Sequence, residues 1–268
     1  MAEELAAGKL LLDEPAEAVA RLRINNPSKR NALDHDILDA FAEVLPRLDR
    51  GIEVRCVVIT GSEGNFSAGY DIGSISEQSL EQDARALVAH PFNAAIEALA
   101  DHPWPTVAAI SGDCLGGGLE LAITCDLRIC AGEARLGMPP AKLGLIYGHT
   151  GLRRFLDAIG LARTKEMFLT ANNIGARRAR EIGLVQDVVG EDELERASVD
   201  LAERIAANAP LALKGNKRAI ETLNAHPVLR PQEEVELIEL RESSLSSEDF
   251  REAITAFAEK RKPKWRGR

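Results

Sequence analysis

Apolar residues recur along the first two thirds of the chain at two different spacings. Residues 54–60 and 106–110 form nearly continuous apolar runs of strand length, which indicates buried β-strands. Residues 34–48 instead carry an apolar stripe with the spacing of an amphipathic helix. Because strands and helices alternate along this part of the chain, the pattern predicts an α/β core. The predicted strands are 19–24, 54–60, 106–110 and 127–130, and the predicted helices are 34–48 and 80–99.

The pattern changes at about residue 191, where helical stripes follow one another without strands. Pro210 and Pro231 are placed as first-turn residues of such helices, and Ser247 as the N-cap of the last one. We therefore predict a core over 1–190 and a C-terminal helical region over 191–268. The four predicted C-terminal helices are 191–207, 210–223, 231–245 and 248–261.

Composition narrows the classes of protein. A chain of 268 residues with 45% apolar content can bury a sizeable core, and no apolar run approaches the ~20 residues of a membrane span. The first residues lack the basic and apolar segments of a signal peptide, so we expect a cytoplasmic protein. The net charge of −9 argues against nucleic acid as a partner, although residues 260–266 form a short basic patch.

Cysteine and histidine positions give no sign of a metal site. The four cysteines form no Cys-x-x-Cys pair and lie within apolar runs, so buried reduced thiols are expected. The five histidines are scattered, and we predict no metal. The cysteines are Cys56, Cys114, Cys125 and Cys130.

The glycine-rich segment 112–120 is the first candidate for a site. Three consecutive glycines, ending at Gly118, precede a predicted helix with Glu120 in its first turn. The first N–H groups of a helix have no partner within it, so such a turn suits either a phosphate or a negative charge that develops during a reaction. A dinucleotide fingerprint would require glycine at Leu121, and the Gly-Lys-Ser/Thr end of a phosphate loop is absent.

A second turn of small residues follows the predicted strand 54–60. Ser67, Ala68 and Gly69 leave the backbone accessible to a ligand, and Asp71 can cap a short helix after it. Each turn taken alone is commonly just a connection between elements. Because each follows a predicted strand, we expect the two turns to face one pocket.

Both turns, together with motifs along nearly the whole chain, resemble the crotonase superfamily, the enoyl-CoA hydratase/isomerase family. The order and spacing of the motifs carry this resemblance more than any one of them. They are Asn25-Asn26-Pro27 with Asn31-Ala32-Leu33, Phe66 to Asp71, Gly116 to Glu120 with Cys125-Asp126, Leu143-Gly144-Leu145, Ala179 to Val185, and Phe257 to Arg261.

The resemblance implies a spiral of ββα units that binds an acyl-CoA thioester. By position, the backbone N–H groups of Tyr70 and Gly117 would hold the thioester oxygen. C-terminal helices of this family build a homotrimer, often paired into a hexamer. No resident cofactor is implied, since coenzyme A enters as part of the substrate. The positions expected to contact substrate or CoA are Ala68, Gly69, Asp71, Ile72, Gly116, Pro140 and Lys260. Lys260 would make this contact in its own or in a neighbouring subunit.

Side chains at the matched catalytic positions leave the reaction open. Glu120 matches one of the two hydratase carboxylates and can act as a base or orient water, or simply favour the helix start. Pro140 stands where the second carboxylate would be, and proline cannot carry a proton there. Tyr147 stands where hydratases usually have proline, a combination similar to the methylmalonyl-CoA decarboxylases, although these have histidine at position 70. His149 could replace that imidazole, but a lone loop histidine is more often a surface residue.

Three hypotheses follow. The first is decarboxylation of a short malonyl-type thioester through an enolate stabilised by the two amides, with Tyr147 holding the substrate carboxylate or donating a hydrogen bond. The second is an enoyl-CoA hydratase or thioester hydrolase that uses Glu120 alone. The third is a CoA-binding or assembly protein without catalysis.

Overall fold

A mixed sheet forms the centre of the chain in the computed structural model, which describes residues 2–71, 91–226 and 228–268. Within these ranges, seven strands pair in the order β1-β2-β3-β4-β5-β7-β10, antiparallel from β1 to β3 and parallel from β3 to β10. These strands are β1 (Glu3–Leu5), β2 (Leu10–Ala16), β3 (Val19–Ile24), β4 (Cys56–Gly61), β5 (Thr106–Ile110), β7 (Leu127–Ala131) and β10 (Asp187–Val189). The smaller sheet of the same ranges contains β6 (Asp113–Leu115), β8 (Arg135–Gly137) and β9 (Ile174–Gly175).

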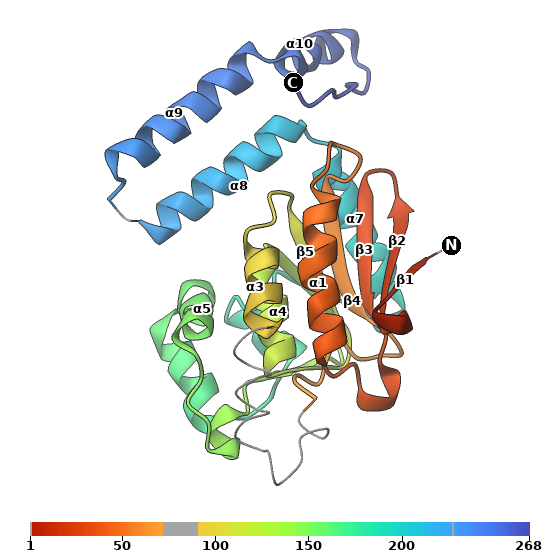
Figure 1. The fold of residues 1–268 in the computed structure, drawn as a ribbon, viewed down its shortest axis with the longest axis vertical. Helices are drawn as coiled ribbons and strands as arrows, with labels where there is room; N and C mark the ends of the chain where they lie inside the picture. Colours follow the sequence, from red (N-terminus) through yellow and green to blue (C-terminus); the bar gives the residue numbers. More distant parts are fainter. Residues whose placement is uncertain (1, 72–90, 227) are drawn as a thin grey trace.

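Both faces of the large sheet are covered by helices (Figure 1). Successive side chains of a strand point to opposite faces, so Val57 and Ile59 pack into the cluster that contains α1, while Cys56 and Val58 pack against α7. This double burial explains why β4 and β5 appear in the sequence as continuous apolar runs. The helices are α1 (His35–Leu48), α3 (Asn93–Ala100), α4 (Gly117–Thr124), α5 (His149–Thr170), α6 (Ala176–Glu181), α7 (Leu194–Ala206), α8 (Pro210–Ala225), α9 (Pro231–Ser246) and α10 (Glu248–Glu259).

The main elements predicted from the sequence are present. Asp34 caps α1 by accepting a hydrogen bond from the Ile37 N–H, and Ser247 caps α10 through the Phe250 N–H, 3.0 Å in each case. The structure begins α7 at Leu194, after a 3₁₀ turn over Glu191–Glu193, so the predicted start at 191 is three residues early. Of the helix predicted over 80–99, residues 80–90 lie outside the described residues, and α3 is its described part.

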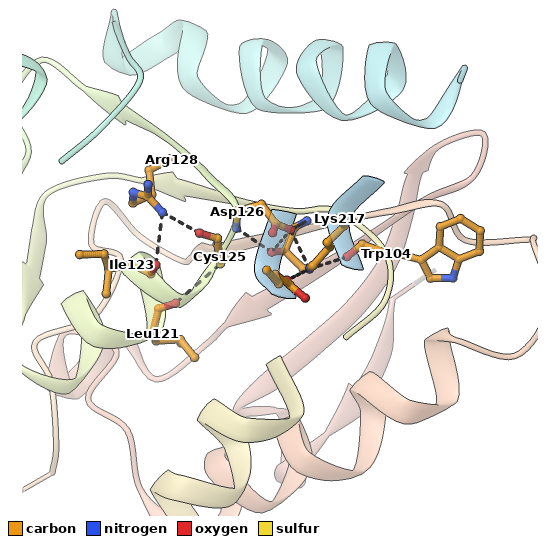
Figure 2. Close-up of polar contacts among 9 residues, drawn as sticks. Trp104, Leu121, Ile123, Cys125, Asp126, Arg128 and Lys217 are labelled. Atoms are coloured by element: carbon orange, nitrogen blue, oxygen red, sulfur yellow. Dashed lines mark hydrogen bonds and ion pairs between the residues drawn. The ribbon is translucent and has the colours of Figure 1, made fainter. Parts of the chain in front are cut away.

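A buried lysine attaches the C-terminal helices to the core (Figure 2). Lys217 of α8 lies 2.8 Å from the Asp126 carboxylate and 3.2 Å from the Trp104 carbonyl. The same carboxylate accepts hydrogen bonds from the N–H and hydroxyl of Thr106, at the start of β5. A buried charge is stable only when it is paired in this way, so α8 is held at one defined place.

Helices α9 and α10 lie beyond α8 and apart from the sheet (Figure 1). The segment after α10 folds back along that helix, because the N–H groups of Arg266 and Gly267 both donate to Asp249. Arg261 pairs with Glu252. Arg261 and Arg266 of the basic patch predicted at 260–266 therefore pair with carboxylates of α10. No helix in the described ranges is long and apolar enough to cross a membrane.

Candidate active site

Two glycine-containing turns are joined edge to edge. Ser67 and Cys114 form an isolated parallel bridge, in which the Ser67 N–H donates to the Asp113 carbonyl and the Leu115 N–H to the Ser67 carbonyl. Gly69 has φ +97°, and a Cβ atom there would lie 2.8 Å from the Leu115 carbonyl oxygen. Only glycine permits both this backbone conformation and this approach. The two turns therefore lie side by side, and that they face one pocket stays a prediction.

The first turn of α4 packs directly on the Ser67 turn. A Cβ atom at Gly118 would lie 2.6 Å from the Ser67 Cβ, so α4 reaches this position only with glycine. A Cβ atom at Gly69 would lie 3.4 Å from the Gly117 nitrogen. The backbone amides of Tyr70 and Gly117 are therefore close neighbours. Among the described residues, neither of these two N–H groups donates a hydrogen bond. Two adjacent unpaired amides are the kind of donor pair that stabilises an oxyanion.

Glu120 follows one turn later and is only 5% exposed. Burial raises the pKa of its carboxyl group above the ordinary value of 4.5. The hydroxyl of Tyr147 donates a hydrogen bond to Oε2 and, with the charge of Arg154, works in the opposite direction on that pKa. Among the described residues, no hydrogen bond involves the other oxygen, Oε1. Glu120 is thus a buried proton acceptor with one oxygen fixed and one available.

The first turn of α5 packs closely against the Glu120 carboxylate. A Cβ atom at Gly151 would lie 2.6 Å from Tyr147 Cε1 and 2.8 Å from Glu120 Oε1. Glycine at this position allows α5 to approach α4 closely enough for the Tyr147–Glu120 hydrogen bond. Pro140 is buried at the start of the 3₁₀ turn Pro140–Leu143, and the preceding strand is joined to Gly116, whose N–H donates to the Gly137 carbonyl.

The side chain of Tyr70 also enters the site. Three of its ring carbons lie 3.1–3.3 Å from the side-chain position of Gly117, and its ring packs edge-on against Phe92 with centroids 4.7 Å apart. Burial, and then the charge of Glu120, raise the pKa of the Tyr70 phenol, while interaction with Tyr147 lowers it. The sequence indicated only the backbone amide of Tyr70 as part of the site.

The remaining residues that the sequence predicted for the site lie partly beside the two amides and partly away from them. Ala68 and Asp71 flank the amide pair: the Ala68 N–H donates to the Arg30 carbonyl, and buried Asp71 pairs with Lys29. His149 is exposed at the start of α5, which agrees with a surface role. Lys260 ends α10, and Figure 1 places that helix away from α4 and α5, so within one chain Lys260 does not join the site. Ile72 lies outside the described residues.

Two arginines that act on Glu120 or on its helix were not predicted from the sequence. Arg128 is buried, and its guanidinium donates to the carbonyls of Ile123 and Cys125 at the C-terminal end of α4 (Figure 2). A cation there complements the helix dipole and caps the helix that carries Glu120.

Arg154 was not predicted because a polar residue on an amphipathic helix normally indicates the solvent face. Its Nε is buried and has no hydrogen-bond partner in the described ranges.

Comparison with known proteins identifies the type of protein to which this fold and site belong. The family model described as enoyl-CoA hydratase/isomerase matches residues 14–268. A short-chain-enoyl-CoA hydratase from Clostridium acetobutylicum is 36% identical over 251 residues, which cover 91% of this chain and 92% of that protein. A 2,3-dehydroadipyl-CoA hydratase from Escherichia coli is 32% identical over 94% of this chain and 96% of that protein.

Solved structures agree with the sequence relatives. The crystal structure of an enoyl-CoA hydratase from Bacillus anthracis matches with a TM-score of 0.87 at 30% identity, covering 97% of this chain and all of that one. The fold is the crotonase fold, an α/β spiral with a C-terminal helical region. The chain belongs to the enoyl-CoA hydratase/isomerase family, and it is an enzyme that acts on CoA thioesters.

Proposed function

We propose that this protein is an enoyl-CoA hydratase in which Glu120 alone supplies the catalytic carboxylate. The observation that carries the proposal is the buried Glu120 carboxylate, fixed by Tyr147 and placed one turn after the Gly117 amide. Relatives named as enoyl-CoA hydratases, similar over more than nine tenths of this chain, support the same reaction.

The chemistry follows from this arrangement. The amides of Tyr70 and Gly117 would hold the thioester oxygen and stabilise the enolate charge that develops on it. Oε1 of Glu120, the oxygen that Tyr147 leaves available, takes a proton from water as the water oxygen bonds to the β-carbon. A proton then reaches the α-carbon, and the product is a 3-hydroxyacyl thioester.

Decarboxylation, the first hypothesis from the sequence, loses its main support. It assigned Tyr147 to the substrate carboxylate, but a phenol has one proton to donate and that of Tyr147 is given to Glu120. A substrate carboxylate placed beside an ionised Glu120 would also meet like charge in a buried site. The relatives reported above are hydratases.

The test is hydration of crotonyl-CoA, followed by loss of the enoyl thioester absorbance and by recovery of 3-hydroxybutyryl-CoA. Glu120→Gln should reduce kcat by about 10³-fold, within the range that a lost general acid–base group causes. Glu43→Gln, at an exposed position of α1, is the matched control and should keep full activity. Carbon dioxide release from methylmalonyl-CoA would support decarboxylation, release of free CoA would support hydrolysis, and binding without turnover would support a non-catalytic role.

The proposal includes self-association into a trimer or a pair of trimers. Large apolar side chains are exposed along the C-terminal helices, with Phe257 at 88% exposure. Large apolar side chains exposed on three successive helices are typical of a protein interface. The exposed apolar residues of these helices are Ile220, Leu223, Val235, Ile238, Leu245, Phe250, Ile254 and Phe257.

We place the enzyme in the cytoplasm, working without a resident cofactor. All four cysteines are free thiols in buried positions, which suits a reducing compartment. Coenzyme A then enters and leaves as part of substrate and product.

A further inference from the structure

Both tyrosines of this chain lie at Glu120. The sequence contains two tyrosines, Tyr70 and Tyr147, from segments 77 positions apart. Both side chains are partly buried against the core, and desolvation, followed by the charge of Glu120, raises the pKa of each phenol. Their convergence on one carboxylate calls for an explanation, because a buried hydroxyl needs a partner and packing alone would be served by phenylalanine.

Tyr147 occupies the middle of this group. Its hydroxyl donates to Glu120. The Tyr70 ring lies against Gly117, three positions before Glu120 in α4, and each phenol affects the pKa of the other, although no hydrogen bond joins the two hydroxyls among the described residues. The three polar groups are therefore neighbours, with Tyr147 beside Glu120 and Tyr70 beside Gly117. A phenol both donates and accepts, so a row of such groups can pass a proton along it.

Tyr70 lies at the end of the row that meets the substrate position. Its ring lies against Gly117, whose amide would hold the thioester oxygen, and the α-carbon of a bound thioester is one bond from that carbonyl carbon. Glu120 lies three positions after Gly117 in α4. The described structure also places a proline, Pro140, where the resemblance to hydratases would put a second proton-carrying carboxylate.

We propose that the hydroxyl of Tyr70 is the acid that protonates the α-carbon, in place of the absent second carboxylate. Glu120 removes a proton from water as the water oxygen bonds to the β-carbon and the double-bond electrons move to the enolate. The Tyr70 O–H bond breaks and its proton bonds to the α-carbon. The resulting phenolate takes a proton from Tyr147, and Tyr147 takes the proton that Glu120 removed from water. The sum is addition of one water molecule, with all three side chains restored.

This inference rests on the proposed hydratase function but can be tested apart from it. In deuterium oxide, exchange of the α-proton of butyryl-CoA reports the group that serves the α-carbon, because that saturated thioester has no double bond to hydrate. If the wild-type enzyme does not hydrate crotonyl-CoA, the proposed function is refuted. The exchange assay with butyryl-CoA would still decide the role of Tyr70.

Tyr70→Phe is the decisive variant, since it keeps the ring against Gly117 and Phe92 and removes only the hydroxyl. We expect kcat for crotonyl-CoA hydration to fall by about 10²-fold with KM changed less than about threefold, as for loss of a general acid. Exchange of the α-proton should fall by a similar factor. Tyr147→Phe, which interrupts the row, should lower exchange as well.

Phe92→Leu is the control for packing, because Phe92 contacts the Tyr70 ring and has no proton to transfer. It should retain hydration and exchange rates within about threefold of wild type. The proposal is overturned if Tyr70→Phe exchanges the α-proton at the wild-type rate, whatever its hydration rate, because Glu120 would then serve the α-carbon directly.

Discussion

Two opposing effects act on the pKa of the Glu120 carboxyl group. Burial favours its neutral form, while the hydrogen bond from Tyr147 and the charge of Arg154 favour the carboxylate. A general base benefits from this balance, because a raised pKa brings its basicity closer to the working pH. Folding is correspondingly less favourable at neutral pH than it would be with a neutral group at this position.

Replacement of Glu120 by glutamine should therefore separate stability from activity. The folded-state pKa of Glu120 is raised, so its contribution to stability is fully present below pH 4.5 and is lost as pH rises through the folded-state pKa. Glutamine carries no charge and its carbonyl can still accept from Tyr147. We expect Glu120→Gln to have an equal or higher Tm at pH 7, with the advantage shrinking toward pH 4. A clearly lower Tm at pH 7 would contradict this account.

Arg154 should set the acid side of the activity profile. Its positive charge lowers the pKa of Glu120, so Arg154→Gln should raise that pKa and move the acid limb of kcat/KM to higher pH. Tyr70 and Tyr147 also face the carboxylate and stay protonated across this range, because burial raises the pKa of both phenols. Arg153→Gln is the control, since Arg153 is exposed and pairs with Asp157 at 2.9 Å. Identical profiles for the two variants would exclude a role for Arg154.

At the scale of elements, the site depends on close approaches of backbone. Helix α4 begins against the Ser67 turn because Gly118 has no side chain, and α5 begins against Glu120 because Gly151 has none. Arg128 fixes the other end of α4. The position of the carboxylate is thus set from both ends of one short helix and by the first turn of another.

Gly151→Ala should disturb catalysis more than folding. The added methyl group would lie 2.8 Å from Glu120 Oε1 and 2.6 Å from the Tyr147 ring, so α5 must shift and the hydrogen bond between them must lengthen. We expect kcat to fall at least tenfold, with a stability loss of about 1–3 kcal/mol, the range for an overpacked site. Urea unfolding and steady-state kinetics measure the two effects. Gly215→Ala in α8, where an added Cβ meets nothing within 4 Å, should leave kcat unchanged.

Elements with a regular pattern were predictable, and elements shaped by close approach were not. Helix α1 has a cap and an unbroken apolar stripe, and β5 is a short apolar run, so local sequence specifies both. Helix α5 escaped prediction because Gly151 and Gly160 interrupt its pattern, the latter at φ +72°. Strand β2 contains Pro15 near its end, which argues against a strand in the sequence.

The site was predicted to a similar extent and for a similar reason. Motif spacing located the amides of Tyr70 and Gly117 and the carboxylate of Glu120. It could not reveal that Tyr147 donates to Glu120 or that the Tyr70 ring lies over Gly117, because these contacts join residues far apart in sequence. The structure shows Tyr147 donating to Glu120, while its expected role toward a substrate carboxylate stays untested.

At the scale of the molecule, helices α9 and α10 lie apart from the sheet (Figure 1), and α8, α9 and α10 expose large apolar side chains. We expect the wild-type protein to have the mass of a trimer or hexamer in light scattering after size-exclusion chromatography. Charge on the exposed face of α10, as in Ile254→Glu with Phe257→Glu, should shift it toward monomer, because burying unpaired carboxylates is unfavourable. Leu161→Glu, at an exposed residue of α5, is the control and should leave the oligomeric state unchanged. A wild-type protein that remains monomeric at high concentration would contradict the prediction.

The attachment of α8 through Lys217 makes the docking of this helix on the core measurable. The Thr106 amide donates to Asp126 at 2.7 Å, and that carboxylate is in turn neutralised by Lys217. Hydrogen–deuterium exchange at this single amide, at the start of β5, should therefore depend on whether the helices more than a hundred positions later are docked. Solvent exchange measured at Thr106 would then report undocking of α8 even under conditions where the sheet itself stays folded.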